Sequence, residues 1–288
     1  MSGDPHDRVA RLSPHVTRLT LPVDTLPPYD HTNAYLVSNG GVAVLVDPGS
    51  RAAVALEIVA AALAAAGART LKAIVLTHTH PDHIDGVPDV LAAYGSPPVY
   101  VHPLESQRLP GSWPTMVLQD GRRLTVGDVV VEALHTPGHS PGHLSLIIRD
   151  AAGAVECQLV GDLVVASGSV WVGLPEGDMA QYLASLALIG SVSAPLLGPG
   201  HGDIITSPRL RLREVAEHRL ERERQVVAAL RAGPKNIAEI TAEVYPGLVE
   251  PVADLAARSV AAHLAKLVAD GVSRRLGPED EDPYVLTA

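Results

Sequence analysis

The chain has 288 residues, a formal net charge of −10 and one cysteine, Cys157. This length allows two unequal domains, and a single cysteine excludes both an intrachain disulfide and a thiolate metal cluster. The acidic balance argues against nucleic acid as the main partner, because affinity for phosphates comes largely from Lys and Arg.

The first part of the chain alternates short apolar runs with turn signals. Seven runs are rich in β-branched residues and are predicted strands: Ala34–Val37, Val42–Val46, Ala73–Leu76, Val99–His102, Val129–Leu134, Leu144–Ile148 and Gln158–Val160. An alanine-rich run from Ala52 to Ala66 predicts a helix between the second and third strands. A helix in this position indicates an α/β crossover.

The pattern changes after Pro208. A charged helix is predicted from Arg209 to about Ala232, where Gly233 and Pro234 end it. Two further helices and a short hairpin are predicted after it, over Asn236–Val244, Pro251–Asp270, Val272–Leu276 and Tyr284–Leu286. Three helices and a hairpin are typical of a winged helix. We therefore expect one domain over residues 1–208 and a second over residues 209–288.

The densest group of polar side chains directly follows the strand predicted at Ala73–Leu76. Four residues with metal-binding side chains lie within six positions: His78, His80, Asp82 and His83. The first two histidines can project toward one ion, and the next two residues can reach a second. Imidazole and carboxylate together favour zinc or a similar first-row divalent metal.

Three more candidates lie in loops at the ends of predicted strands. His143 comes just before a strand, Asp162 follows a strand and could bridge two ions, and His201 stands between two glycines. Alone, a His or Asp beside Gly is more often a turn residue than a ligand. Together with the dense group, the three predict a two-metal site.

The motifs H-x-H-x-D-H, T-P-G-H-S-P-G-H, Gly-Asp and Gly-His-Gly, in this order, resemble the metallo-β-lactamase superfamily. The resemblance extends from about Pro14 to Ser207. It implies an α+β fold in which two sheets and their outer helices form an αββα sandwich, here followed by a small winged-helix domain.

The resemblance also implies roles for the residues of these motifs. His78, His80 and His143 would hold the first zinc, Asp82, His83 and His201 the second, and Asp162 would bridge the two. His139 would then be structural, and Asp47 would orient ligands from behind. The implied cofactor is a pair of Zn²⁺ ions, with Mn²⁺ or Fe²⁺ as alternatives.

Two divalent ions lower the pKa of a bridging water, and the resulting hydroxide attacks the substrate. The expected protein is therefore a binuclear metal-dependent hydrolase. Asp82 is the expected catalytic residue, placed to orient the hydroxide and to pass a proton to the leaving atom. Cys157 lies in a predicted strand without a nearby histidine, and we interpret it as a bystander.

The later part of the chain resembles the β-lactamase-like protein 2 group, on Tyr182–Leu186, Gly198–Gly202 and Ala262–Leu267. This group and its neighbours imply either a thioester or similar small acyl substrate, or cleavage of single-stranded RNA by an endoribonuclease. Glyoxalase II shares the ligand motifs. It places a Lys and a Tyr for glutathione where this chain reads Ser167–Val172, so glutathione is not expected.

Two nucleic-acid hypotheses concern the part of the chain after Pro208. The arginines of its first predicted helix could contact RNA phosphates, but the glutamates alternating with them favour a solvated helix face. A metal-dependent regulator that binds DNA through the winged helix is the alternative from another class. A nearly neutral tail and a complete ligand set weigh against it, so no duplex DNA partner is expected.

The sequence also bears on location. The first 21 residues lack the apolar run of a signal peptide, and no later stretch has the length of a membrane span. We expect a cytoplasmic protein without a membrane partner. The sequence allows either a monomer or an oligomer.

Overall fold

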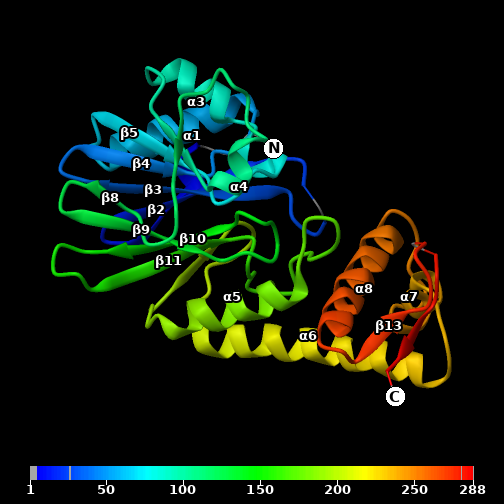
Figure 1. Cartoon of the computed structure of the whole chain (residues 1–288). Coiled ribbons are helices and arrows are strands. Elements are labelled where there is room, and N and C mark those ends of the chain that lie inside the picture. Colours follow the sequence, from blue (N-terminus) through cyan, green and yellow to red (C-terminus); the bar gives the residue numbers. More distant parts are fainter. Residues whose placement is uncertain (1–4, 26, 280, 288) are drawn as a thin grey trace.

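The structure is a computed structural model that describes residues 5–25, 27–279 and 281–287. Two β-sheets lie face to face, helices cover their outer sides, and a helical module extends from one end (Figure 1). The predicted αββα sandwich and α+β class are confirmed.

The first sheet has seven strands in the order β1-β2-β3-β4-β5-β6-β7. They are β1 (Val9–Ser13), β2 (Val16–Pro22), β3 (His31–Asn39), β4 (Val42–Val46), β5 (Thr70–Val75), β6 (Val99–Val101) and β7 (Thr115–Val117). Helix α1 (Ala53–Ala65) joins the parallel strands β4 and β5, which confirms the predicted crossover. The short helices α2 (Pro81–Ile84), α3 (Val87–Ala93) and α4 (Pro103–Ser106) follow β5 and β6.

The second sheet has five strands in the order β12-β11-β10-β9-β8. They are β8 (Arg123–Val126), β9 (Val129–His135), β10 (Leu144–Arg149), β11 (Val155–Gly161) and β12 (Leu197–Pro199), and helix α5 (Met179–Ser191) precedes β12. The sequence did not predict β1, β2, β7, β8 and β12. Of these, β7 and β12 have three residues each, too short for a strand period to show.

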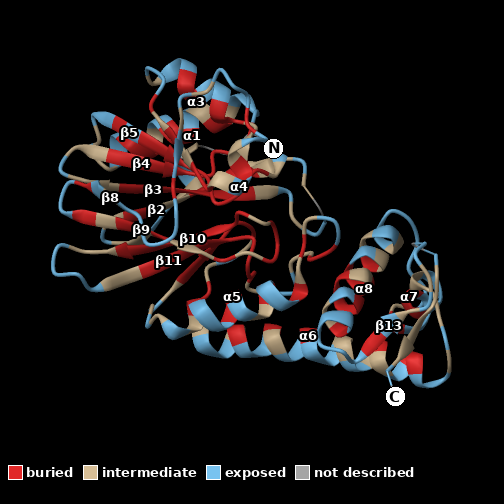
Figure 2. Ribbon diagram, in the orientation of Figure 1, coloured by how far each residue is buried: buried red, intermediate tan, exposed pale blue. Residues whose placement is uncertain are grey.

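The alternation of β4 explains how one strand serves two cores. Ala43 and Leu45 pack toward α1 and α3, whereas Val44 and Val46 pack between the two sheets. Successive side chains of a strand point to opposite faces, so an all-apolar strand is buried on both sides. Figure 2 shows the strands of both sheets mostly buried and the outer helices exposed on one side.

The C-terminal module contains α6 (Pro208–Arg231), α7 (Ile237–Val244), α8 (Val252–Ala269) and the hairpin of β13 (Ser273–Arg275) with β14 (Tyr284–Leu286). All its elements were predicted. Helix α6 belongs to two cores: Leu212 and Val215 pack beneath the second sheet, and Val226 and Leu230 pack inside the module. The domain boundary at residue 208 stays a prediction, because α6 crosses from one core to the other. Among the described residues, no helix is both long and apolar enough to cross a membrane.

Candidate metal centre

The predicted ligands meet at one edge of the sandwich. Residues 77–83 follow β5, the loop 136–143 joins β9 to β10, and Asp162 and His201 follow the parallel strands β11 and β12. Because these chain ends share an edge of the sheets, their side chains converge. His78, His83 and His143 are fully buried.

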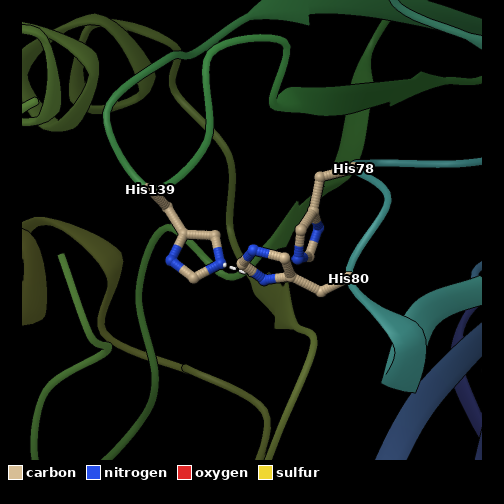
Figure 3. A group of neighbouring side chains, drawn as sticks. All are labelled: His78, His80 and His139. Carbon is tan, nitrogen blue, oxygen red and sulfur yellow. Dashed lines mark hydrogen bonds between the residues drawn. The ribbon is translucent and has the colours of Figure 1, made fainter. Parts of the chain in front are cut away.

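The first donor group consists of His78, His80 and His139, whose ligand atoms lie within 4.8 Å of one another. His139 Nε2 is 3.0 Å from His80 Nδ1. The ring of His78 is centred 4.5 Å from the ring of His80 and 4.9 Å from that of His139. Figure 3 shows the three imidazoles facing a common point, with His139 arriving from a different loop.

The second donor group consists of Asp82, His83 and His201, and its ligand atoms also lie within 4.8 Å of one another. Asp162 stands between the two groups. Its Oδ1 is 3.3 Å from His83 Nε2, and its Oδ2 is 3.4 Å from His201 Nε2 and 3.7 Å from His139 Nε2. One carboxylate therefore faces both groups, and its role as a bridging ligand stays a prediction.

The outward nitrogens of five histidines contact protein oxygens. The pairs are His78 Nδ1 with Thr77 Oγ1 (3.0 Å), His80 Nε2 with Glu176 Oε2 (3.2 Å), His83 Nδ1 with Asp47 Oδ2 (2.9 Å), His139 Nδ1 with the Trp171 carbonyl (2.8 Å) and His201 Nδ1 with the His31 carbonyl (2.8 Å). Carbonyl and carboxylate oxygens accept, so these nitrogens donate, and the inward nitrogen of each neutral ring keeps a lone pair. Thr77 Oγ1 donates to Asp47 and can therefore accept from His78.

Buried atoms without hydrogen-bond partners test whether these residues fit metal ions. His78 Nε2, His83 Nε2 and Asp162 Oδ1 are buried, and none has a hydrogen bond of ordinary geometry. Buried polar atoms are normally satisfied, because leaving them unpaired is costly. Inward lone pairs and unpaired oxygens that converge in one place are what divalent ions require, and imidazole with carboxylate suits zinc.

Asp47 supports the centre from behind, as predicted. In addition to His83, it accepts hydrogen bonds from the Thr77 backbone N–H (2.8 Å) and from Thr77 Oγ1 (2.6 Å). The loop that carries Asp47 packs tightly on the turn that carries Asp82. At Gly49, an added Cβ would collide with the Asp82 carbonyl, so only glycine fits there.

The two histidines of the T-P-G-H-S-P-G-H motif have different surroundings. His143 Nε2 accepts a hydrogen bond from the Asp162 backbone N–H (3.2 Å), and its Nδ1 contacts Thr136 Oγ1 (3.0 Å). Both of its ring nitrogens are therefore occupied by the protein. His139 instead joins His78 and His80 in the first donor group, so we propose His139 rather than His143 as the ligand.

The physical reason lies in the backbone. His143 adjoins β10, and its carbonyl accepts from Thr136 N–H, which keeps its side chain inside the sheet structure. His139 follows Gly138, whose φ of 132° is open to glycine and turns the loop toward the site. Pro-Gly precedes both histidines, so the motif by itself did not distinguish them.

Three further residues of the centre were not predicted. The Thr25 hydroxyl donates to Asp82 Oδ2, Glu176 contacts His80, and the Tyr29 ring stacks on His201 with centroids 5.5 Å apart. All three come from loops without a motif, so only the tertiary structure brings them to the site.

Titration differs between the two groups. Burial lowers the pKa of His78 well below its ordinary value and that of His139 to about 4, so both rings are neutral at neutral pH. Neutral imidazole is the form that binds metal. Burial also opposes the charged form of His201, but the carboxylates of Asp162 and Asp82 outweigh it and raise its pKa to about 10. The second group therefore favours positive charge, whether a proton or a metal ion.

Comparison with known proteins agrees with this geometry. Residues 27–201 match the family model described as the metallo-beta-lactamase superfamily. This chain belongs to that superfamily. Residues 237–279 match the beta-lactamase associated winged helix domain, so the predicted winged helix is confirmed. The superfamily assignment and a thioesterase among the relatives indicate a hydrolase.

Three similar proteins show how much of this chain its relatives match and at what identity. An atrochrysone carboxyl ACP thioesterase of Aspergillus chevalieri is 29% identical over 77% of this chain and 68% of its own length. A beta-lactamase-like protein 2 homolog of Caenorhabditis elegans is 26% identical over 84% and 80%, which confirms the predicted resemblance to that group. A metallo-beta-lactamase family protein of Thermus thermophilus has a TM-score of 0.77 and 26% identity, covering 96% of this chain and 100% of that one.

Proposed function

We propose that this superfamily hydrolase binds two Zn²⁺ ions and cleaves an acyl thioester. His78, His80 and His139 would hold one ion, Asp82, His83 and His201 would hold the other, and Asp162 would serve both groups. The same donors accept Mn²⁺ or Fe²⁺ as alternatives. The observation that carries the proposal is the position of Asp162, whose oxygens face histidines of both groups.

When bound, such ions lower the pKa of a coordinated water toward neutrality and polarise the carbonyl of the substrate. The chain supplies the proton chemistry through Asp82. In the metal-free protein, burial opposes the ionised form of Asp82, but the hydrogen bond with His201 and the charge of His83 hold its pKa well below the usual range. The Thr25 hydroxyl fixes the carboxylate. Asp82 is therefore placed to take a proton from water and return it to the leaving sulfur, giving a carboxylic acid and a thiol.

A thioester is favoured over RNA by the contacts of three arginines on α6. Arg219 is buried and donates to the Val170 carbonyl, Arg211 donates to the Val165 carbonyl (2.8 Å), and Arg222 donates to the Val244 carbonyl (3.0 Å). Side chains that hold the protein's own backbone are poorly placed to contact phosphates. The thioesterase among the relatives supports the same substrate class.

A regulator that binds duplex DNA is disfavoured by the packing of α8, the long helix that a winged helix would present to DNA. Ser259 Oγ donates to the Val172 carbonyl (2.9 Å), and Ala262 is buried in the core beneath the second sheet. A recognition helix must enter the major groove with a free face. This face of α8 is covered by the catalytic domain.

The test compares the zinc-loaded protein with its Asp82→Ala variant on an acyl thioester and on unstructured RNA, together with metal analysis. We expect about two equivalents of metal, thioester cleavage by the wild type, and loss of that cleavage in the variant. Cleavage of RNA but not of the thioester would replace the substrate assignment. Fewer than one equivalent of metal with unchanged activity in His80→Ala would end the metal proposal.

A further inference from the structure

The segment of residues 170–178, here called the bridging segment, contacts the first donor group. The Trp171 carbonyl accepts from His139 Nδ1 (2.8 Å), and Glu176 Oε2 accepts from His80 Nε2 (3.2 Å). The Asp178 backbone N–H donates to the carbonyl of Gly138 (2.9 Å), directly before His139. Two of the three histidines of this group are thus oriented by one segment.

The opposite side of the bridging segment is held by α8 of the C-terminal module. The Trp171 indole N–H donates to the Leu255 carbonyl (3.0 Å), and Ser259 Oγ donates to the Val172 carbonyl (2.9 Å). The Leu174 backbone N–H donates to the Arg258 carbonyl (3.3 Å). From α6, the Arg219 guanidinium donates to the Val170 carbonyl.

The segment has one internal turn, in which the Gly177 N–H donates to the Gly173 carbonyl (2.8 Å), and the contacts above hold the rest of it. All residues between β11 and α5 are described, and they form neither helix nor strand. Val172 is fully buried in the same apolar core as Ala262 of α8. A loop without an internal hydrogen-bond ladder takes the conformation that its anchors impose.

Glu176 is itself held from a second direction. Its Oε1 accepts from the Arg108 guanidinium (2.7 Å), while its Oε2 faces His80. A carboxylate fixed on both oxygens can hold an imidazole in one orientation and one tautomer. Arg108 lies two residues after α4, which follows strand β6 of the first sheet. The ion pair between Arg108 and Glu176 therefore connects the bridging segment to the first sheet.

We propose that the C-terminal module positions the first donor group through the bridging segment, with Trp171 and Glu176 as positioning residues. This inference rests on the proposed metal binding. The α8 helix fixes Trp171, the Trp171 carbonyl fixes the ring of His139, and Glu176 fixes that of His80. The winged helix then serves as a structural part of the metal centre.

The two tryptophans of the chain offer a matched test. Trp113 packs against the core between the first sheet and its outer helices, whereas the bridging segment packs in another core, so Trp113→Phe is the control. The double variant Trp171→Phe/Ser259→Ala removes both side-chain hydrogen bonds to or from α8. Zn²⁺ affinity is measured by competition with a chromophoric chelator, Co²⁺ coordination by absorption, and Tm on the metal-free proteins.

We expect the double variant to bind the weaker of its two Zn²⁺ ions about 10–100-fold less tightly than the wild type does, as for other partners of metal ligands. The Co²⁺ spectrum should change in parallel, and the control should match the wild type. In the Trp113→Phe protein, Trp171 is the remaining tryptophan, and its fluorescence should change as Zn²⁺ is added. Equal Zn²⁺ affinity in the double variant and the control would overturn this inference alone.

A second variant covers the case in which the double variant folds poorly, which its metal-free Tm would reveal. Glu176→Ala leaves the α8 contacts intact, and its side chain is partly exposed. It should weaken Zn²⁺ binding in the same range while the metal-free Tm stays near that of the wild type. Unchanged affinity in Glu176→Ala would overturn the role of Glu176. A wild type that binds no Zn²⁺ would overturn both this inference and the proposed function.

Discussion

A cluster of histidines in the catalytic domain and a single buried histidine in the C-terminal module show what separates a site from a structural residue. In the catalytic domain, the outward nitrogens of five rings are paired and the inward ones converge beside Asp162. In the C-terminal module, His263 is equally buried, but neither of its ring nitrogens has a hydrogen bond of ordinary geometry, and Glu223 Oε2 lies 3.5 Å from its Nδ1. Burial is common to both, and only the first group has several donors aimed at one place.

The largest expected effect comes from the residue on which the donors converge. Asp162→Ala removes the carboxylate between the two groups, so we expect metal content to fall below two equivalents. Activity should fall by more than the ~10²–10⁴-fold that one acid–base group contributes. Metal analysis and the hydrolysis assay measure both effects. Asp128→Ala, an exposed aspartate on the β8–β9 hairpin, should behave like the wild type.

The second largest effect is expected for Asp82, the proposed proton carrier. Asp82→Asn keeps the shape of the side chain but removes the charge that its surroundings stabilise. We expect kcat to fall by ~10²–10⁴-fold while the folded structure is retained, as for loss of a general acid–base group. Steady-state kinetics and circular dichroism check this. Full activity in the variant would remove Asp82 from proton transfer.

Variants of His139 and His143 distinguish a metal ligand from a residue that stabilises the fold. His139→Ala should lose about one equivalent of metal, because it removes a donor of the first group. His143→Ala should keep both equivalents at saturating metal. It leaves the Asp162 N–H and Thr136 without their partner, which should lower the free energy of unfolding by ~1–3 kcal/mol. Metal analysis and urea unfolding measure the pair. The opposite pattern would restore His143 as the ligand.

The smallest effect tests His263. Burial lowers the pKa of His263 in the folded protein below its ordinary value, which the unfolded chain retains. At a pH between these two pKa values, the unfolded chain therefore binds more protons than the folded protein does. The contribution of His263 to the free energy of unfolding is therefore fully present above about pH 6.5. It falls on acidification, by at most ~1.4 kcal/mol per pH unit. His263→Leu should flatten this decline between pH 7 and pH 5, measured by urea unfolding. Metal content should not change, and a loss of metal would show that His263 belongs to the centre.

The sequence by itself determined the superfamily, the hydrolase class and most of the architecture. The density of ligand types at His78–His83 is visible without a fold, and the all-apolar run of β4 predicts a strand buried on both faces. The capped α7 and the glycine after α8 likewise predict the winged helix from local signals. These features are local, because side-chain type and backbone period are carried by neighbouring residues.

Only the tertiary structure decided which side chains point at one another. His139 and His143 lie four residues apart in one motif, and the pairing of the His143 backbone and the turn at Gly138 decide which ring reaches His80. Trp171 and Glu176 carry no motif and reach the centre through contacts with α8 and Arg108. Such directions depend on partners distant in the sequence, and a pattern of neighbouring residues does not contain them.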